Sequence, residues 1–311
     1  MQAAAMALSC TVCVSAAEDE TIKLTVWGAE EDQDLLKELT DKFQEKYADQ
    51  KFDIQIGVES ESTAKDTILT DVEAGADVYA FADDQLTDLV KAGALLKLDD
   101  YAEALQLVDT TLDDVKAANV EGAIDAASWD SLLEAADKAG KKVGMTLASG
   151  NLVACVSGTW DAITAQDVFG DGYAATKLPT FTVGDKQVQQ GSVAGYKYVG
   201  VNGYSENSGW AVLLAEYLTN EESQQMFFDQ RESGPSNKNV AASDSVQENV
   251  ALAALSAQSE YAQAQKVGGK YWDPAQTFGE LVAQGTLSAD DDNAIQEALD
   301  NLVDGVTAPV E

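Results

Sequence analysis

Aromatic side chains occur together with acid and amide side chains in two short segments, residues 27–32 and residues 81–85. A flat aromatic ring covers the C–H face of a pyranose, while carboxylates and amides hydrogen-bond its hydroxyl groups in pairs. The chemistry that this combination predicts is therefore non-covalent sugar binding. The expected polar contacts are Glu30, Glu31, Asp84 and Gln85, and the expected stacking ring is Phe81.

The same residues also have a purely structural explanation. Trp27 and Phe81 could be core residues, and the acidic side chains could cap the helices that follow. Either segment alone fits this explanation. The presence of the same combination in both segments favours binding.

The elements that would position these side chains follow from hydrophobic periodicity. Alternating apolar residues predict strands near 21–26, 52–58 and 77–82, and four-residue apolar spacing predicts a helix after each. A β-α-β-α-β-α run forms a parallel sheet covered by helices, and ligands bind beyond the carboxyl ends of its strands. Residues 27–32 and 81–85, which we call the sugar-type segments, both fall at such ends. The second half is also mixed, and its alanine-rich stretch predicts one helix over residues 246–265.

Composition excludes several classes of protein. The chain has 54 acidic and 19 basic residues, a net charge of −35, which repels phosphate backbones and excludes nucleic acid as a partner. It has no histidine, so Ser-His-Asp and Cys-His catalysis are excluded. The acidic run at residues 290–293 lacks the alternating ligands and the glycine of a calcium loop, so neither metal nor cofactor is expected. A chain of 311 residues is long enough for more than one domain.

Residues 1–17 are small and apolar and are followed by three acidic residues. This pattern predicts the remnant of a secretory signal with cleavage after Ala16, too short to span a membrane. Lipidation of Cys10 is an open alternative. Removal of this segment would leave Cys155 as the one cysteine, which excludes a disulfide within the mature chain.

Further aromatic residues lie at turns in the second half of the sequence. Trp160 follows a predicted strand, and Trp272 lies in a turn before a helix. Either tryptophan could pack in a core or stack on a sugar. Tyr196 and Lys197 are weaker candidates, because Tyr and Lys are common at ordinary strand edges.

Several of these stretches, taken in order, resemble the maltose-binding-protein-like extracellular solute-binding proteins of bacterial ABC transporters. The resemblance implies two α/β lobes joined by a hinge, the type II periplasmic-binding-protein fold, with a mixed sheet and flanking helices in each lobe. The stretches that carry it are residues 23–28, 77–86 with 93–96, 156–160, 177–181 with 195–197, and the 271–274 turn.

The resemblance also implies roles for individual residues. Phe81, Asp84 and Gln85 would contact sugar from the first lobe, with Glu30 and Glu31 at the place of another contact. Trp160 and Trp272 would stack from the second lobe, and Tyr196 and Lys197 would lie near the hinge. The implied first lobe comprises residues 18–125 and 198–242, and the second comprises 128–197 and 243–311.

The chain departs from the family pattern at two junctions, residues 122–129 and 146–151, where expected strands and helices are missing. These departures indicate internal deletions and an incomplete fold. Missing strands would leave unpaired sheet edges and exposed apolar helix faces.

The sequence therefore predicts a secreted, monomeric, non-enzymatic receptor. It would bind maltose- or maltodextrin-like oligosaccharides between its lobes and deliver them to the permease subunits of an ABC transporter. The alternatives are a secreted glycosidase that uses paired carboxylates, a receptor of the same fold for another solute, and a nonfunctional truncated remnant.

Overall fold

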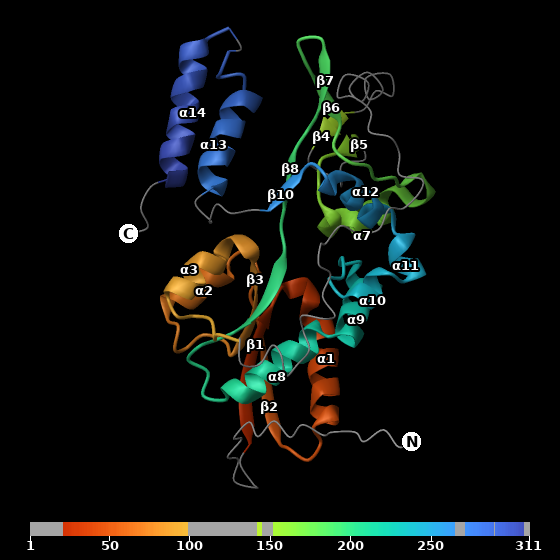
Figure 1. Cartoon of the computed structure of the whole chain (residues 1–311), viewed down its shortest axis with the longest axis vertical. Coiled ribbons are helices and arrows are strands. Elements are labelled where there is room, and N and C mark those ends of the chain that lie inside the picture. The colour runs from red at the N-terminus through yellow and green to blue at the C-terminus, as the bar shows by residue number, and fades with distance from the viewer. Residues whose placement is uncertain (1–20, 99–141, 145–151, 265–270, 289, 308–311) are drawn as a thin grey trace, which may run out of the picture.

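The structure is a computed structural model that describes residues 21–98, 142–144, 152–264, 271–288 and 290–307 (Figure 1). The expected signal segment and both junctions of the expected deletions lie outside these residues. No helix in the described ranges is long and apolar enough to cross a membrane.

A mixed four-stranded sheet with the order β2-β1-β3-β9 forms the largest sheet of the fold. The central strand β1 runs parallel to β2 and to β3, and β9 pairs antiparallel with β3. The three parallel strands confirm the sheet predicted from the first β-α-β-α-β-α run. The strands are β1 (Ile22–Gly28), β2 (Phe52–Val58), β3 (Val78–Ala82) and β9 (Lys197–Val201).

Helices cover both faces of this sheet, because successive side chains of each strand point to opposite faces. On one face, Leu24, Val26 and Val78 pack in a core with α1 and α8. On the other face, Tyr79 and Phe81 pack in a second core with α2 and α3. Figure 1 shows α2 and α3 on one side of the strands and α1 on the other. The helices are α1 (Gln33–Lys46), α2 (Ala64–Thr70), α3 (Leu86–Lys91), α8 (Ser208–Thr219) and α9 (Glu221–Arg231). We call the four-stranded sheet with these five helices the sheet region.

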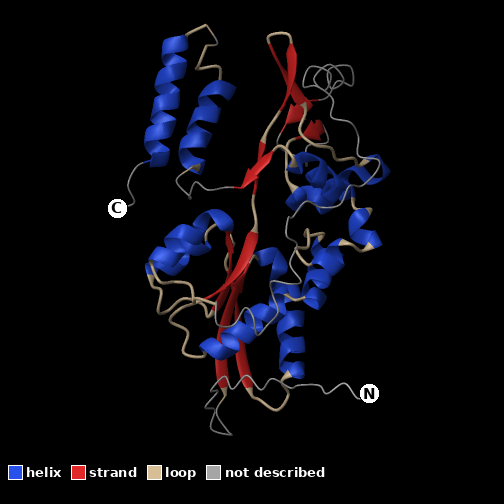
Figure 2. Cartoon of the chain, viewed as in Figure 1, coloured by secondary structure: helices blue, strands red, loops and turns tan. Residues whose placement is uncertain are grey.

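The remaining elements form what we call the distal region (Figure 2). Its strands make three separate two-stranded sheets, β4 with β5, β6 with β7, and β8 with β10. The strands are β4 (Lys142–Gly144), β5 (Leu152–Cys155), β6 (Thr180–Val183), β7 (Lys186–Gln189), β8 (Ser192–Ala194) and β10 (Ala262–Ala264). The helices are α7 (Ala162–Phe169), α10 (Lys238–Ala241), α11 (Asp244–Gln247), α12 (Val250–Ser259), α13 (Trp272–Ala283) and α14 (Asp292–Thr307).

The chain passes between the two regions at two described places. It leaves the β8–β10 pair after Ala194 and enters the four-stranded sheet at Lys197. After α9 it leaves again through α10 and α11 to α12, which contacts β10. The expected return of the chain to the first lobe, with boundaries at residues 198 and 242, stays a prediction.

The prediction of a single helix over residues 246–265 is wrong. The stretch is divided into α11, α12 and the short strand β10. The Asn249 side chain accepts the backbone N–H of Leu252 at 3.0 Å, so it caps a new helix. Ala262–Ala264 pairs with β8, a tertiary interaction that overrides the helical preference of alanine.

Candidate functional site

The two sugar-type segments form short 3₁₀ turns directly after β1 and β3. These turns are η1 (Glu30–Asp32) and η2 (Asp83–Gln85). Because β1 and β3 are parallel neighbours, both turns lie at the same edge of the sheet. Glu30 and Glu31 are exposed there, so their carboxylates are available to a ligand.

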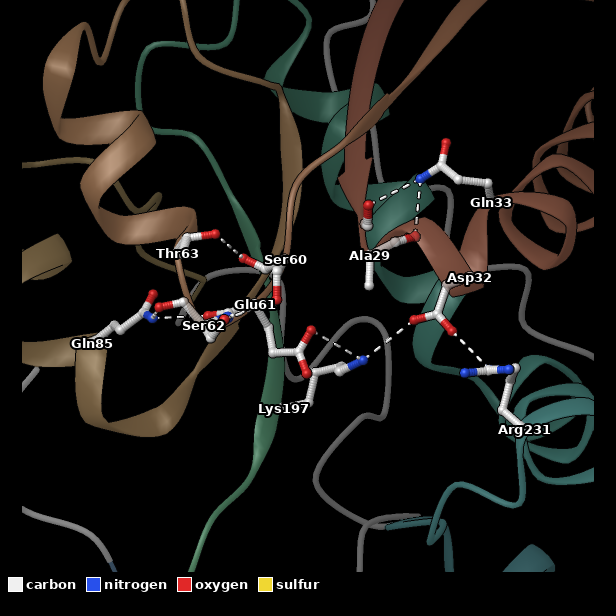
Figure 3. Close-up of polar contacts among 11 residues, drawn as sticks. Ala29, Asp32, Gln33, Ser60, Glu61, Ser62, Thr63, Gln85, Lys197 and Arg231 are labelled. Atoms are coloured by element: carbon white, nitrogen blue, oxygen red, sulfur yellow. Dashed lines mark hydrogen bonds and ion pairs between the residues drawn. The ribbon is translucent and has the colours of Figure 1, made fainter. Parts of the chain in front are cut away.

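Asp32, the last residue of η1, is buried and lies between two cations (Figure 3). Its Oδ2 lies 3.3 Å from Lys197 Nζ, and its Oδ1 lies 3.2 Å from Arg231 Nε. Lys197 Nζ also lies 3.4 Å from Glu61 Oε2. Burying a carboxylate is unfavourable unless it is paired and hydrogen-bonded, and both oxygens of Asp32 meet that condition.

The backbone next to η1 is held by the side chain of Gln33. Its Nε2 donates to the carbonyl oxygens of Gly28 at 2.9 Å and Ala29 at 3.1 Å (Figure 3). The same Nε2 lies 3.3 Å from the carbonyl oxygen of Gly57, at the end of β2. The turn that carries Glu30 and Glu31 is therefore fixed to two neighbouring strands.

Gln85, a predicted polar contact, is only 3% exposed. Its Nε2 donates to the carbonyl oxygens of Glu61 and Ser62, both at 2.8 Å (Figure 3). Its Oε1 accepts the backbone N–H of Lys65 at 3.1 Å. The amide thus joins η2 to the loop that follows β2, and its donors and its acceptor are in use within the protein.

Phe81, the predicted stacking ring, is also only 3% exposed. Its ring centroid lies 5.9 Å from that of Tyr79 and 5.6 Å from that of Tyr198. In this conformation the ring packs in the core beneath η2 and presents no open face. Its predicted contact with sugar stays a prediction.

The structure brings Asp84 and Trp272 together from positions 188 residues apart. The indole Nε1 of Trp272 donates to Asp84 Oδ2 at 3.4 Å. Trp272 is 54% exposed and packs edge-on against Tyr271, with ring centroids 5.3 Å apart. A partly open indole and a carboxylate therefore face the same space, one from each region of the molecule.

Tyr196 and Asp83 connect the η2 turn with the strand that enters the sheet. The backbone N–H of Asp83 donates to the carbonyl oxygen of Tyr196 at 3.0 Å, directly before Lys197. Burial raises the pKa of the Asp83 carboxyl above its ordinary value. Tyr196 itself is half-buried, so part of its ring remains accessible.

Trp160 is the most exposed of the predicted aromatic contacts, at 79%. It lies in η4 (Thr159–Asp161), between β5 and α7. A Cβ atom on Gly158 would lie 2.1 Å from the indole ring, so glycine is required for the ring to lie against the backbone. Within the described part of the chain, no hydrogen bond, ion pair or ring contact joins Trp160 to Asp84, Trp272 or Lys197.

Sequence reasoning missed Asp32, Glu61 and Arg231. Asp32 was included in a sugar-type segment but was not distinguished from Glu30 and Glu31. Its burial depends on tertiary packing that no local pattern reports. A usable signal did exist for Arg231, because it is the only arginine in the sequence. Arginine is the cation best suited to a buried carboxylate, since its planar group presents several donors.

The arrangement suits binding by hydrogen bonds and ring contacts. Exposed carboxylates lie on η1, and the η2 carboxylate of Asp84 accepts a hydrogen bond from the partly open indole of Trp272. No group of three or more Asp, Glu or Cys residues in the described ranges is arranged to hold a metal ion.

Comparisons with known proteins concern the family and the fold of the chain. Residues 141–254 match the family model of bacterial extracellular solute-binding proteins. No curated protein matches the sequence.

Solved structures match the chain over nearly its whole length. One described as being with acarbose is 25% identical, with a TM-score of 0.74, and the match covers 92% of this chain and 98% of that one. The maltodextrin-binding protein MalE1 from L. casei BL23 is 17% identical, with a TM-score of 0.72 and coverage of 93% and 99%. The maltose/maltodextrin-binding domain MalE from Bdellovibrio bacteriovorus is 14% identical, with a TM-score of 0.70 and coverage of 92% and 98%.

The fold of this chain is therefore the two-lobe α/β fold of extracellular solute-binding proteins, with mixed sheets flanked by helices. Within that class, its resemblance to maltose-binding-protein-like members is confirmed.

Proposed function

We propose that the chain is the substrate-binding component of a carbohydrate ABC importer and that it binds maltodextrin-like oligosaccharides between its two regions. The observation that carries this proposal is the meeting of Asp84 with Trp272. A carboxylate from the sheet region and an indole from the distal region bring together a hydroxyl acceptor and a stacking ring, the two kinds of contact that a pyranose needs. The printed descriptions of the similar structures, which name maltodextrin and acarbose, support the same ligand class.

The residues of the proposed site differ in where they lie and in what each would supply to a ligand. Trp160 and Trp272 supply exposed ring faces, and Glu30, Glu31 and Asp84 supply hydroxyl acceptors. Tyr196 and Lys197 lie where the chain crosses between the regions. Phe81 and Gln85 lie beneath this surface and hold the η2 turn in place. The proposed set is Glu30, Glu31, Phe81, Asp84, Gln85, Trp160, Tyr196, Lys197 and Trp272.

The proposal includes partners and location. The bound sugar would pass to membrane permease subunits, and the protein would act as a secreted monomer outside the cytoplasm. The match to an extracellular family supports that location. The proposed role is binding without catalysis, so incubation with maltodextrin should yield no shorter products. Shorter products would favour the glycosidase alternative.

Titration calorimetry with maltotriose tests the site. Trp272→Ala removes a ring contact and the indole donor, and we expect affinity to fall by about tenfold, which corresponds to about 1.4 kcal/mol. The matched control is Tyr204→Ala, which removes another half-exposed aromatic ring. Tyr204 follows β9 at the opposite edge of the sheet from η1 and η2, so its loss should leave affinity unchanged. Equal affinity of the Trp272 variant and the wild type would contradict the assignment of Trp272.

A further inference from the structure

The buried carboxylate of Asp32 joins three parts of the chain that are far apart in sequence. One oxygen faces Lys197 at 3.3 Å and the other faces the only arginine, Arg231, at 3.2 Å (Figure 3). The Asp32 side chain is 10% exposed, whereas the two cations are 43% and 32% exposed. The carboxylate is thus the shielded centre of the cluster.

Both cations mark places where the chain crosses between the two regions. Lys197 is the first residue of β9, and the preceding strand β8 belongs to the distal region. Arg231 is the last residue of α9, and the next residue, Glu232, has a left-handed backbone conformation with φ of 50°. Beyond Glu232 the chain continues to α10, α11 and α12. One carboxylate therefore holds the sheet-region end of both crossings.

We propose that Asp32 is a positioning residue of the hinge, which fixes both crossings to the turn that carries Glu30 and Glu31. This inference rests on the proposed function. Backbone groups near both crossings are also held locally, because Asp83 donates to the carbonyl oxygen of Tyr196 and Ser236 and Asn237 donate to Gln224 Oε1. Asp32 adds the contact that ties the two crossings to each other and to η1. A sugar bound to Glu30 or Glu31 acts on the same three-residue turn, so ligand binding and hinge geometry are coupled through Asp32.

The chemistry of Asp32→Asn makes the inference testable. Asparagine has the shape of aspartate, but it presents one acceptor oxygen and one donor NH₂ group. The oxygen can pair with one cation only, and the NH₂ group must face the other, so one crossing loses its ion pair with the turn. Removal of one partner from a buried charge cluster has a large effect, in contrast to an exposed ion pair.

An exposed pair of the same kind supplies the matched control. Lys37 and Asp41 in α1 form an ion pair in which both side chains are more than half exposed. Asp41→Asn makes the same chemical change as Asp32→Asn at a position that touches neither crossing.

The experiment measures the separation of the two regions in the full chain by pulsed electron resonance. Spin labels are placed at Asp49→Cys in the sheet region and Asp167→Cys in α7, both exposed positions, with the native cysteines replaced by alanine. Without ligand, we expect a broader distance distribution in Asp32→Asn than in the wild type or in Asp41→Asn. Maltotriose affinity should fall about tenfold for Asp32→Asn and less than twofold for Asp41→Asn.

The outcomes separate the inference from the proposed function. A distribution in Asp32→Asn as narrow as in the wild type overturns the inference, even where the wild type binds maltotriose. A wild type that binds no maltotriose refutes the proposed ligand, while the distance measurement still tests the hinge. Where Asp32→Asn does not fold, Arg231→Gln provides the second variant, since it removes the ion pair of the α9 crossing alone. It should broaden the distribution, and an unchanged distribution there also overturns the inference.

Discussion

The sheet region and the α13–α14 helix pair of the distal region differ in how they bury apolar residues. In the sheet region, Leu39 and Phe43 of α1 are fully buried against the sheet and α8. In the distal region, every residue of α13 is at least partly exposed, and Ala298 is the one residue of α14 that is buried. Val282 and Val303 are each more than half exposed. A pocket of about 590 Å³ lies between these two helices.

This difference shows that an amphipathic helix is buried only where a sheet or another helix receives its apolar face. α1 has such a surface on β1 and α8, whereas the described contacts of α13 and α14 are mainly with each other. Elements with few buried apolar contacts open more readily than core elements. The proposed site therefore combines carboxylates from a well-packed region with Trp272 from a helix pair that buries little apolar surface.

The largest effect is expected from a change in the sheet-region core. Leu39→Ala removes a fully buried side chain, so we expect the free energy of unfolding to fall by about 2–5 kcal/mol in chemical denaturation. The matched change in the distal region is Val282→Ala. It should alter the free energy of unfolding by less than about 0.5 kcal/mol, because the Val282 side chain is more than half exposed. A large loss of unfolding free energy for Val282→Ala would mean that α13 packs on a further surface. The difference in packing between α1 and α13 would then not hold.

Local pattern was enough to predict most of the sheet region. The alternation of Ile22, Leu24 and Val26 predicts β1 to within two residues at its carboxyl end, because one buried face imposes a period of two. The same reasoning found β2, β3 and α1. The β6–β7 hairpin was not predicted, although Gly184 with φ of 64° is a usable turn signal between alternating residues.

Tertiary contacts account for what the sequence did not reveal. The contact of Asp84 with Trp272 spans 188 residues, and no local pattern reports such a distance. The strand β10 forms because β8 lies beside it. Likewise, Asp32 is distinguished from the exposed Glu30 and Glu31 by its burial and by the cations that reach it from β9 and α9. Local composition thus identified the turns but not the partners of each side chain.

A smaller effect should appear in amide hydrogen exchange. We expect the backbone amides of α13 and α14 to exchange before those of α1, because local opening of the helix pair exposes little buried surface. Addition of maltotriose should slow exchange at the start of α13, next to Trp272, and leave the end of α14 unchanged. Equal protection of α1 and α13 without ligand would contradict the stability difference, and absence of any ligand effect would contradict a role for Trp272.

The smallest effect concerns the titration of Glu216 in α8, within the sheet region. Burial raises the pKa of its carboxyl above the ordinary value of 4.5, and nearby Lys46 opposes the rise. A raised pKa in the folded state means that Glu216 contributes stability below its unfolded pKa, and this contribution is lost as pH rises through the folded pKa.

Glu216→Gln should therefore stabilise the protein at pH 7 by less than about 1 kcal/mol, because the half-buried group is partly screened by solvent. The gain should vanish near pH 4, as measured by denaturation at both pH values. A gain at pH 7 that persists at pH 4 would mean that the carboxyl of Glu216 does not carry the effect.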